Sequence, residues 1–282
     1  MALATFQQLL PTARKGKYAI GSFNVWDLYS TKTVVETAER LRSPVILALY
    51  DVELALAGEK QLYEVVLSYA RQVSTPVAVF IDHAKSVDEI KHAMSFGLSS
   101  VMIDCSRFEL AQNIMFTRQA VEIAHAAHIS IEGEIGTIGE EDRPDVDAKA
   151  YTDVDEARQF ARETGVDALA VAIGNQHGFY RAEPKLDFDR LQAIASTVDC
   201  PLVLHGGTGI PTPDVQRAIE MGVAKVNIGA EGRLAYMTGL REGLAAAESN
   251  EKFPHKLFPH AFQRHAELIE QKLHDFGSVG QA

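Results

Sequence analysis

Eight short apolar segments with strand character recur along the chain, and amphipathic segments with apolar residues at helical spacing lie between many of them. Strand followed by helix, eight times over, is the pattern of a (β/α)8 barrel, the TIM barrel of the α/β class. We therefore expect a barrel over about residues 18–245 and a C-terminal helical extension over about 258–276. The expected strands are 19–25, 44–49, 76–82, 100–105, 130–136, 168–174, 201–207 and 225–229.

The length of 282 residues suits either one large α/β domain or two small ones, and no break in composition favours two. There is no low-complexity tract and no repeat at the level of sequence. We therefore predict a single domain over residues 1–282. The clearest helical stretches between the strands are 31–41, 86–97, 113–128, 153–165 and 212–222.

The formal net charge of −11 argues against binding to nucleic acid or to an anionic membrane surface. The first residues carry no basic segment followed by an apolar core, and no apolar run approaches the length that spans a membrane. The two cysteines, Cys105 and Cys200, lie in or beside apolar runs, as buried thiols in a reducing compartment do. These features predict a soluble, cytoplasmic protein.

Polar side chains stand at the ends of most expected strands, where a barrel carries its catalytic groups. Histidines end the third, sixth and seventh strands, and three neutral imidazoles converging on one point form an open zinc site. A single histidine in such a place is more often a buried residue satisfied by hydrogen bonds. The residues at strand ends are Asn24, Asp82, His83, Asp104, Glu134, His177, His205 and Asn227.

A catalytic zinc ion can hold a carbonyl oxygen and stabilise the negative charge that develops when the adjacent carbon loses a proton. Such chemistry also needs an acid and a base, which Asp82 and Glu141 could supply. Glu141 lies in the long acidic segment 136–153, which has the length of a functional lid. Taken alone, Glu141 is better explained as a solvated acid in an acidic loop.

Glycine-rich segments follow the last two strands and could hold an anion. HGGTG begins at His205, and NIGAEGR begins at Asn227. The loops after strands seven and eight commonly bind phosphate in barrels, because small residues let backbone N–H groups point at its oxygens. Glycines also serve tight turns alone, so this pattern is weak by itself.

Taken together, the segments IDH, EGEIG, AIGNQHGFY, LVLHGGTGIP and KVNIGAE resemble the class II ketose-bisphosphate aldolases, a metal-dependent family. The similarity runs in order from about Tyr18 to about Gly277 and is nearest to a less-characterised bacterial branch. The resemblance implies a zinc site formed by His83, His177 and His205.

The resemblance also assigns roles to residues around that site. It implies that Asp82 exchanges a proton with the C4 hydroxyl of the sugar and that Glu141 exchanges one with dihydroxyacetone phosphate. Asp104 and Glu134 correspond to carboxylates that support the ligands or form a second metal position. The substrate-binding positions, near which the family also places a monovalent cation (Na⁺ or K⁺), are Asn24, Gly178, Gly206, Gly207, Thr208, Asn227, Ile228, Gly229 and Ala230.

Several positions depart from the family pattern. Ala230 lacks a hydroxyl that relatives carry, which implies weaker phosphate binding or a phosphate closer to Arg181. One residue is missing before the Glu141–Asp142 pair, so Glu140 competes as the loop base. Arg264 is the nearest candidate for a group that binds a distal phosphate, but it does not align clearly.

The leading hypothesis is a zinc-dependent aldolase that reversibly cleaves a phosphorylated ketose, a 1-phosphate or a 1,6-bisphosphate, to dihydroxyacetone phosphate and an aldehyde. Relatives of this kind are dimers or tetramers. A Schiff-base aldolase is a rival hypothesis and needs a reactive lysine near the substrate carbonyl. Lys85 is close to the end of the third expected strand, whereas Lys225 begins the last expected strand at the wrong face.

Two further alternatives come from other classes of function. A metal-dependent hydrolase could use the same ligands, although such sites often take an H-x-H pair from the first strand, where this chain has FNVW. A barrel that has lost activity and only binds a sugar phosphate or stabilises a partner subunit is favoured by Ala230 and by Tyr50, which stands where relatives often carry a small or hydroxyl residue. The helical histidines His125, His128, His260 and His265 are expected to face solvent or a subunit contact.

Overall fold

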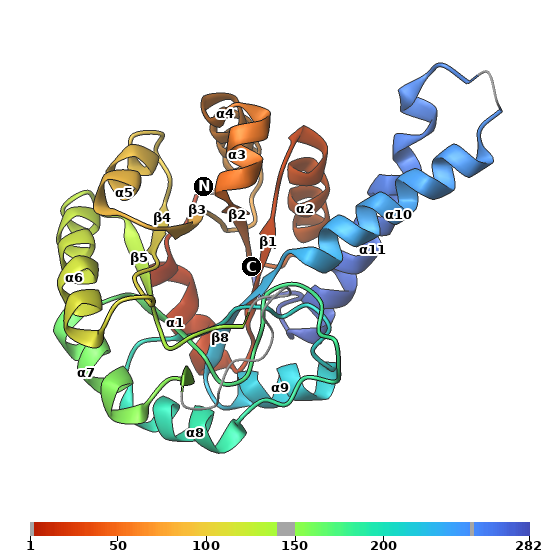
Figure 1. Cartoon of the computed structure of the whole chain (residues 1–282). Coiled ribbons are helices and arrows are strands. Elements are labelled where there is room, and N and C mark those ends of the chain that lie inside the picture. The colour runs from red at the N-terminus through yellow and green to blue at the C-terminus, as the bar shows by residue number, and fades with distance from the viewer. Residues whose placement is uncertain (1–2, 140–149, 249–250) are drawn as a thin grey trace.

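The computed structural model describes residues 3–139, 150–248 and 251–282, and its eight strands form a closed parallel barrel in sequence order (Figure 1). Each predicted apolar segment coincides with one strand, which confirms the TIM barrel, although β3 ends two residues later and β8 begins two residues earlier than predicted. The strands are β1 (Ile20–Asn24), β2 (Val45–Leu49), β3 (Val77–Ala84), β4 (Ser100–Ile103), β5 (Ser130–Ile135), β6 (Ala168–Val171), β7 (Leu202–Leu204) and β8 (Val223–Ile228).

Helices surround the barrel, and the predicted helical stretches coincide with α2, α5, α6, α7 and α9. The predicted C-terminal helix is α11. The helices are α1 (Phe6–Gly16), α2 (Leu28–Leu41), α3 (Asp51–Ala57), α4 (Glu59–Gln72), α5 (Val87–Met94), α6 (Leu110–Ala126), α7 (Val154–Thr164), α8 (Phe188–Thr197), α9 (Thr212–Glu220), α10 (Ala230–Ala246) and α11 (Phe258–Asp275), with a short 3-10 helix, η2 (Pro254–Lys256), before α11.

The strands read as nearly continuous apolar runs because both of their faces are buried, one against the outer helices and one inside the barrel. The inward side chains form a separate apolar cluster with α1. Phe6 of α1 packs edge-to-face on Phe80 of β3, with ring centroids 5.4 Å apart. α1 thereby closes the N-terminal end of the barrel and leaves the other end to carry a site.

The last two long helices, α10 and α11, lie side by side and extend away from the barrel (Figure 1). Gly239 permits their close approach, since a Cβ there would come within 2.3 Å of the His260 carbonyl oxygen. α11 also packs on α2 and so returns to the barrel. Of the helices in the described part of the chain, none is both long enough and apolar enough to cross a membrane.

One helical histidine, His265, does not face solvent as the sequence predicted, whereas the His125 side chain is 37% exposed. His265 is 1% exposed and packs beside Trp26, with ring centroids 5.3 Å apart. His125 places Nε2 3.0 Å from a carboxylate oxygen of Asp167. His265 follows the helical spacing of the buried face of α11, since Ala261 lies four residues before it and Ile269 four residues after it.

Candidate active site

His83 lies near the end of β3, where the strand departs from regular geometry. The register between β3 and β4 shifts between Ile81 and Ala84, and His83 has a φ of 55°, in the left-handed region that residues other than glycine rarely adopt. Neighbours in a regular strand point to opposite faces. Here the irregularity lets both Asp82 and His83 line the same pocket.

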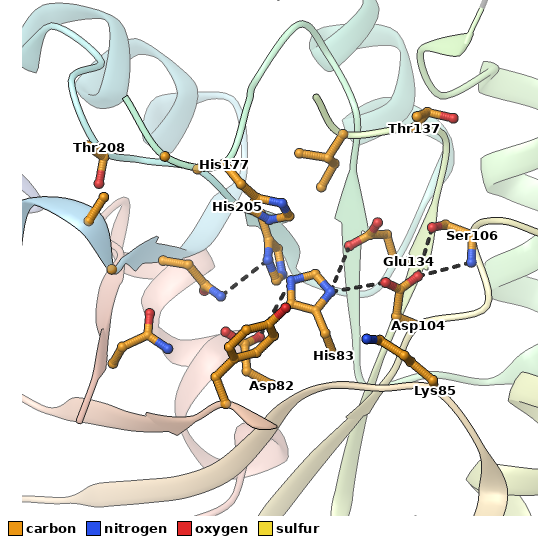
Figure 2. Close-up of a pocket in the computed structure, with 18 of the residues that line it drawn as sticks. Asp82, His83, Lys85, Asp104, Ser106, Glu134, Thr137, His177, His205 and Thr208 are labelled. Atoms are coloured by element: carbon orange, nitrogen blue, oxygen red, sulfur yellow. Dashed lines mark hydrogen bonds and ion pairs between the residues drawn. The ribbon is translucent and has the colours of Figure 1, made fainter. Parts of the chain in front are cut away.

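His177 and His205 follow β6 and β7 and reach the same point. The ring centroid of His83 lies 5.0 Å from that of His177 and 4.8 Å from that of His205. One ligand nitrogen from each of the three histidines lies within 4.8 Å of the other two. Figure 2 shows the three rings converging beside Asp82, so the structure brings together the histidines that the sequence singled out.

Three carboxylates surround His83. Asp104 Oδ2 lies 3.1 Å and Glu134 Oε2 3.9 Å from Nδ1, and Asp82 Oδ1 lies 3.8 Å from Nε2. His83, Asp104 and Glu134 form a second group whose ligand atoms all lie within 4.8 Å of one another. The two carboxylates expected near the metal ligands are therefore adjacent to one of them.

Burial and neighbouring charges shift the pKa values of three residues in this cluster. Burial lowers the pKa of His83, but the carboxylates of Asp82 and Asp104 outweigh burial and raise that pKa to about 10. Burial, reinforced by Asp104, raises the pKa of Glu134 to about 8. Burial and the neighbouring His83 keep the pKa of His205 well below its usual value, so its imidazole is neutral. A neutral imidazole is the form that binds a metal ion, so His83 would lose its Nε2 proton when a metal ion binds.

Two buried carboxylate oxygens, Asp82 Oδ1 and Glu134 Oε2, have no hydrogen-bond partner among the described residues. A buried carboxylate in this state is costly unless a cation lies near it. Three histidine nitrogens with nearby carboxylates, open on one side, match the ligand set of a catalytic zinc ion. The residues present therefore fit a divalent metal ion.

The histidines lie in a pocket of about 440 Å³, and most of the predicted substrate-binding residues line it. Gly206 is required there, because its φ is 63° and a Cβ would come within 2.0 Å of the Gln176 carbonyl oxygen. The predicted residues that line the pocket beside the histidines and carboxylates are Asn24, Gly178, Gly206, Thr208, Asn227, Gly229 and Ala230.

Three predicted substrate-binding residues do not line this pocket. Arg181 is exposed to solvent. Gly207 packs behind the pocket, where a Cβ would come within 2.6 Å of Val226 Cγ1, and Ile228 is buried. Glu140 and Glu141 lie outside the described residues.

The sequence from residue 4 to residue 281 matches the family model described as class II fructose-bisphosphate aldolase. The chain belongs to this family. It is accordingly a class II aldolase, a lyase that breaks and forms a carbon–carbon bond. The family is generally zinc-dependent, in agreement with the histidine cluster.

Individual relatives cover nearly the whole of this aldolase. It is 37% identical over 286 residues to a fructose-bisphosphate aldolase of Geobacillus stearothermophilus, across 100% of this chain and 99% of the relative. The crystal structure of the YdjI aldolase of Escherichia coli K12 superposes with a TM-score of 0.90, at 35% identity and 99% coverage of both chains. A putative fructose-1,6-bisphosphate aldolase of Coccidioides immitis gives a TM-score of 0.86 at 30% identity, covering 97% of this chain and 96% of that one.

Among the polar residues that sequence reasoning missed at the site of this aldolase are Arg233 and Glu132. Arg233, in the first turns of α10, lines the pocket and donates from Nε to Glu53 Oε1 at 3.0 Å. Glu132 of β5 lies inside the barrel, 2.7 Å from Nε2 of His205. The signal for Glu132 was present, since a charged residue in the middle of a buried strand needs a charged or polar partner.

Proposed function

We propose that this aldolase is zinc-dependent and reversibly cleaves a phosphorylated ketose, a 1-phosphate or a 1,6-bisphosphate, to dihydroxyacetone phosphate and an aldehyde. The observation that supports it most is the meeting of His83, His177 and His205 beside Asp82 in one pocket. Family membership supports aldol chemistry, and the histidine cluster supports the metal. We also propose a single domain over residues 1–282, a homodimer or homotetramer, and a cytoplasmic location.

In this proposal the three histidines hold zinc, which when bound stabilises negative charge on the carbonyl oxygen of the substrate. Asp104 accepts a hydrogen bond from His83 Nδ1 and leaves Nε2 of that ring to face the metal. Ser106 donates to Asp104 from its hydroxyl at 2.7 Å and from its backbone N–H at 3.1 Å, and so holds the carboxylate in place.

Asp82 is the proposed proton-transfer group for the C4 hydroxyl. Its side chain is only 7% exposed, and its Oδ1 faces the pocket side of His83 at 3.8 Å from Nε2. A carboxylate placed there can take a proton from a substrate hydroxyl during cleavage and return it during condensation. Glu141, or its neighbour Glu140, is proposed to exchange the proton on dihydroxyacetone phosphate.

The loops after β7 and β8 are proposed to hold the phosphate of dihydroxyacetone phosphate. Gly206, Thr208, Gly229 and Ala230 line that part of the pocket, where a Na⁺ or K⁺ ion would help to balance the phosphate charge. Two cationic side chains, Lys85 and Arg233, also line the pocket, and both have carboxylate partners that an anionic substrate could replace. Arg264 instead pairs with Glu242 between α10 and α11.

A panel of ketose 1-phosphates and 1,6-bisphosphates, assayed before and after chelation and with zinc restored, tests the proposal. We expect cleavage of at least one member, loss on chelation and recovery with zinc. Borohydride added with substrate separates the Schiff-base route, for which Lys85 is the accessible candidate because the Lys225 side chain is 0% exposed. A trapped covalent adduct together with activity after chelation would contradict the zinc mechanism.

A further inference from the structure

A lysine and a glutamate are buried together in the centre of the barrel. Lys225 of β8 and Glu132 of β5 have side chains that are 0% exposed, and Lys225 Nζ lies 2.7 Å from Glu132 Oε2. The sequence placed Lys225 at the start of its strand, but β8 begins at Val223 and its register carries Lys225 inward. Burying such a pair costs more than an apolar pair of similar volume, so stability alone does not account for it.

Aromatic rings hold the ammonium group of Lys225 from the N-terminal side of the barrel. Nζ lies 4.3 Å from the ring centroid of Phe80 and 5.5 Å from that of Phe6. Cation–π attraction and the carboxylate of Glu132 together fix the position of the ammonium group. Lys225 in turn fixes the carboxylate of Glu132, because one of its two oxygens is engaged by Nζ.

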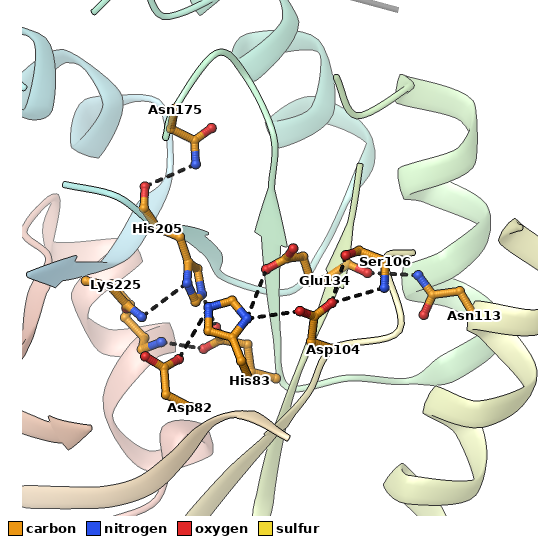
Figure 3. Close-up of polar contacts among 11 residues, drawn as sticks. Asp82, His83, Asp104, Ser106, Asn113, Glu134, Asn175, His205 and Lys225 are labelled. Carbon is orange, nitrogen blue, oxygen red and sulfur yellow. Dashed lines mark hydrogen bonds and ion pairs between the residues drawn. The ribbon is translucent and has the colours of Figure 1, made fainter. Parts of the chain in front are cut away.

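The other oxygen of Glu132 determines which nitrogen of His205 carries hydrogen. Oε1 lies 2.7 Å from His205 Nε2, and an ionised carboxylate only accepts hydrogen bonds, so Nε2 donates. In a neutral imidazole the remaining nitrogen, Nδ1, then carries the lone pair. Asn227 Nδ2 lies 3.3 Å from Nδ1, as a donor does toward an accepting nitrogen, and a bound metal ion would replace this contact. Figure 3 shows the ring of His205 close to that of His83.

The backbone of His205 is held as firmly as its ring. Asn175 Nδ2 donates to the His205 carbonyl oxygen at 3.1 Å. The next residue, Gly206, lies against the Gln176 carbonyl, and a Cβ at this position would come within 2.0 Å of that oxygen. The ring can therefore present only one nitrogen to the pocket.

We propose that Lys225 and Glu132 are positioning residues that fix His205 in the one tautomer and orientation that offers Nδ1 to the metal ion. This inference rests on the proposed zinc site but concerns the chain's own residues. Carboxylates that accept from metal-binding histidines orient the ring and strengthen metal binding. In this barrel the carboxylate of Glu132 is itself held in place by the buried ammonium group of Lys225.

Two double variants test the proposal without changing the net charge of the barrel interior. E132L/K225M removes both charges and the acceptor for His205, whereas E132Q/K225M removes the charges and keeps a neutral acceptor. Replacing a buried pair by uncharged residues avoids the unpaired charge that a single change would leave. We expect the zinc dissociation constant, measured by chelator competition, to rise about 10- to 100-fold for E132L/K225M and less for E132Q/K225M.

The matched control is D167N, which weakens another histidine–carboxylate pair of the same barrel, partly buried and far from the zinc ligands in the fold. His125 Nε2 lies 3.0 Å from Asp167 Oδ2 at the opposite end of the barrel. D167N should bind zinc as the wild type does. The absorption spectrum of the cobalt-substituted protein reports the geometry of the metal ligands. Folded E132L/K225M protein with wild-type zinc affinity and an unchanged spectrum of this kind would overturn the proposal.

A measurement on the wild-type protein keeps the proposal testable if the variants do not fold. Nitrogen-15 NMR of the histidine rings, with zinc and then cadmium bound, identifies the protonated and the metal-bound nitrogen of His205. We expect hydrogen on Nε2 and metal on Nδ1, and metal on Nε2 would overturn the inference. Wild-type protein that binds no metal at all would instead contradict the proposed function.

Discussion

The two ends of this barrel treat buried carboxylates in opposite ways. At the N-terminal end, Asp167 accepts hydrogen bonds from Gln7 Nε2 at 2.7 Å, from the Ile131 backbone N–H at 2.7 Å and from His125 Nε2 at 3.0 Å. At the C-terminal end, Asp82 and Glu134 each keep a buried oxygen without a hydrogen-bond partner among the described residues. The carboxylate at the N-terminal end is satisfied by hydrogen bonds within the protein, whereas those at the C-terminal end keep oxygen atoms available for a ligand.

The difference separates residues that stabilise the fold from residues that react. α1 closes the N-terminal end, and Arg14 within it donates to backbone carbonyls of Ala195, Val198, Asp199 and Cys200. A buried polar group without a partner requires an explanation, and a cluster of them in one pocket is explained by an ion or a substrate that binds there. Substitutions at the C-terminal end should therefore lower activity, and substitutions at the N-terminal end should lower stability.

The largest effect is expected from His177→Ala at the C-terminal end. Loss of one of three histidine ligands should abolish zinc binding and lower kcat by more than the ~10⁴-fold that a proton-transfer group contributes at most. Metal content by mass spectrometry and turnover of a cleaved ketose phosphate measure both. The control is His274→Ala on an exposed position of α11, which should keep zinc and turnover. Full turnover by metal-free H177A protein would contradict the mechanism.

A smaller loss is expected from Asp82→Asn, which keeps the shape of the side chain but cannot accept a proton. The kcat for cleavage should fall by about 10²- to 10⁴-fold while zinc remains bound. Asp88→Asn is the matched control, because the Asp88 side chain is 95% exposed. Wild-type kcat for D82N would remove Asp82 from the proposed proton transfer.

At the N-terminal end, Leu10→Ala should affect stability and not chemistry. Leu10 is 0% exposed in the interior cluster, so its truncation should lower the free energy of unfolding by about 2–5 kcal/mol. Leu56→Ala provides the control, because Leu56 is 89% exposed and its loss should leave stability almost unchanged. Urea unfolding and kcat/KM at 25 °C check the pair, and a large drop in kcat/KM for L10A would break the division between the two ends.

The smallest effect is a pH dependence of stability from His265, away from both ends. Burial lowers its pKa from 6.5 to about 4. The unfolded chain therefore binds the proton first, and stability should fall as pH drops from about 6.5 to about 4 and level off below that. His265→Phe should lessen the loss between pH 7 and pH 5.5 by about 1 kcal/mol, measured by urea unfolding. An identical slope in H265F would show that the ring is not buried in its neutral form.

The strands and the three histidines could be predicted because their signals are local. A strand buried on both faces needs a continuous apolar run, and a polar residue at its end stands out from that run. The pairing of Lys225 with Glu132 could not be predicted, because the two residues are 93 positions apart and meet only when the barrel closes. The contact of His265 with Trp26 likewise depends on how α11 packs in the folded chain.

Hydrogen exchange on dihydroxyacetone phosphate in D2O, with no aldehyde present, tests the central claim most directly. It measures proton removal next to the carbonyl without requiring the identity of the aldehyde or the sugar. The proposed site predicts enzyme-dependent deuterium incorporation that disappears on chelation, returns with zinc and is absent in H177A. Exchange at the full rate in verified metal-free protein, or no exchange in zinc-loaded protein, would contradict a zinc-dependent aldolase at this end of the barrel.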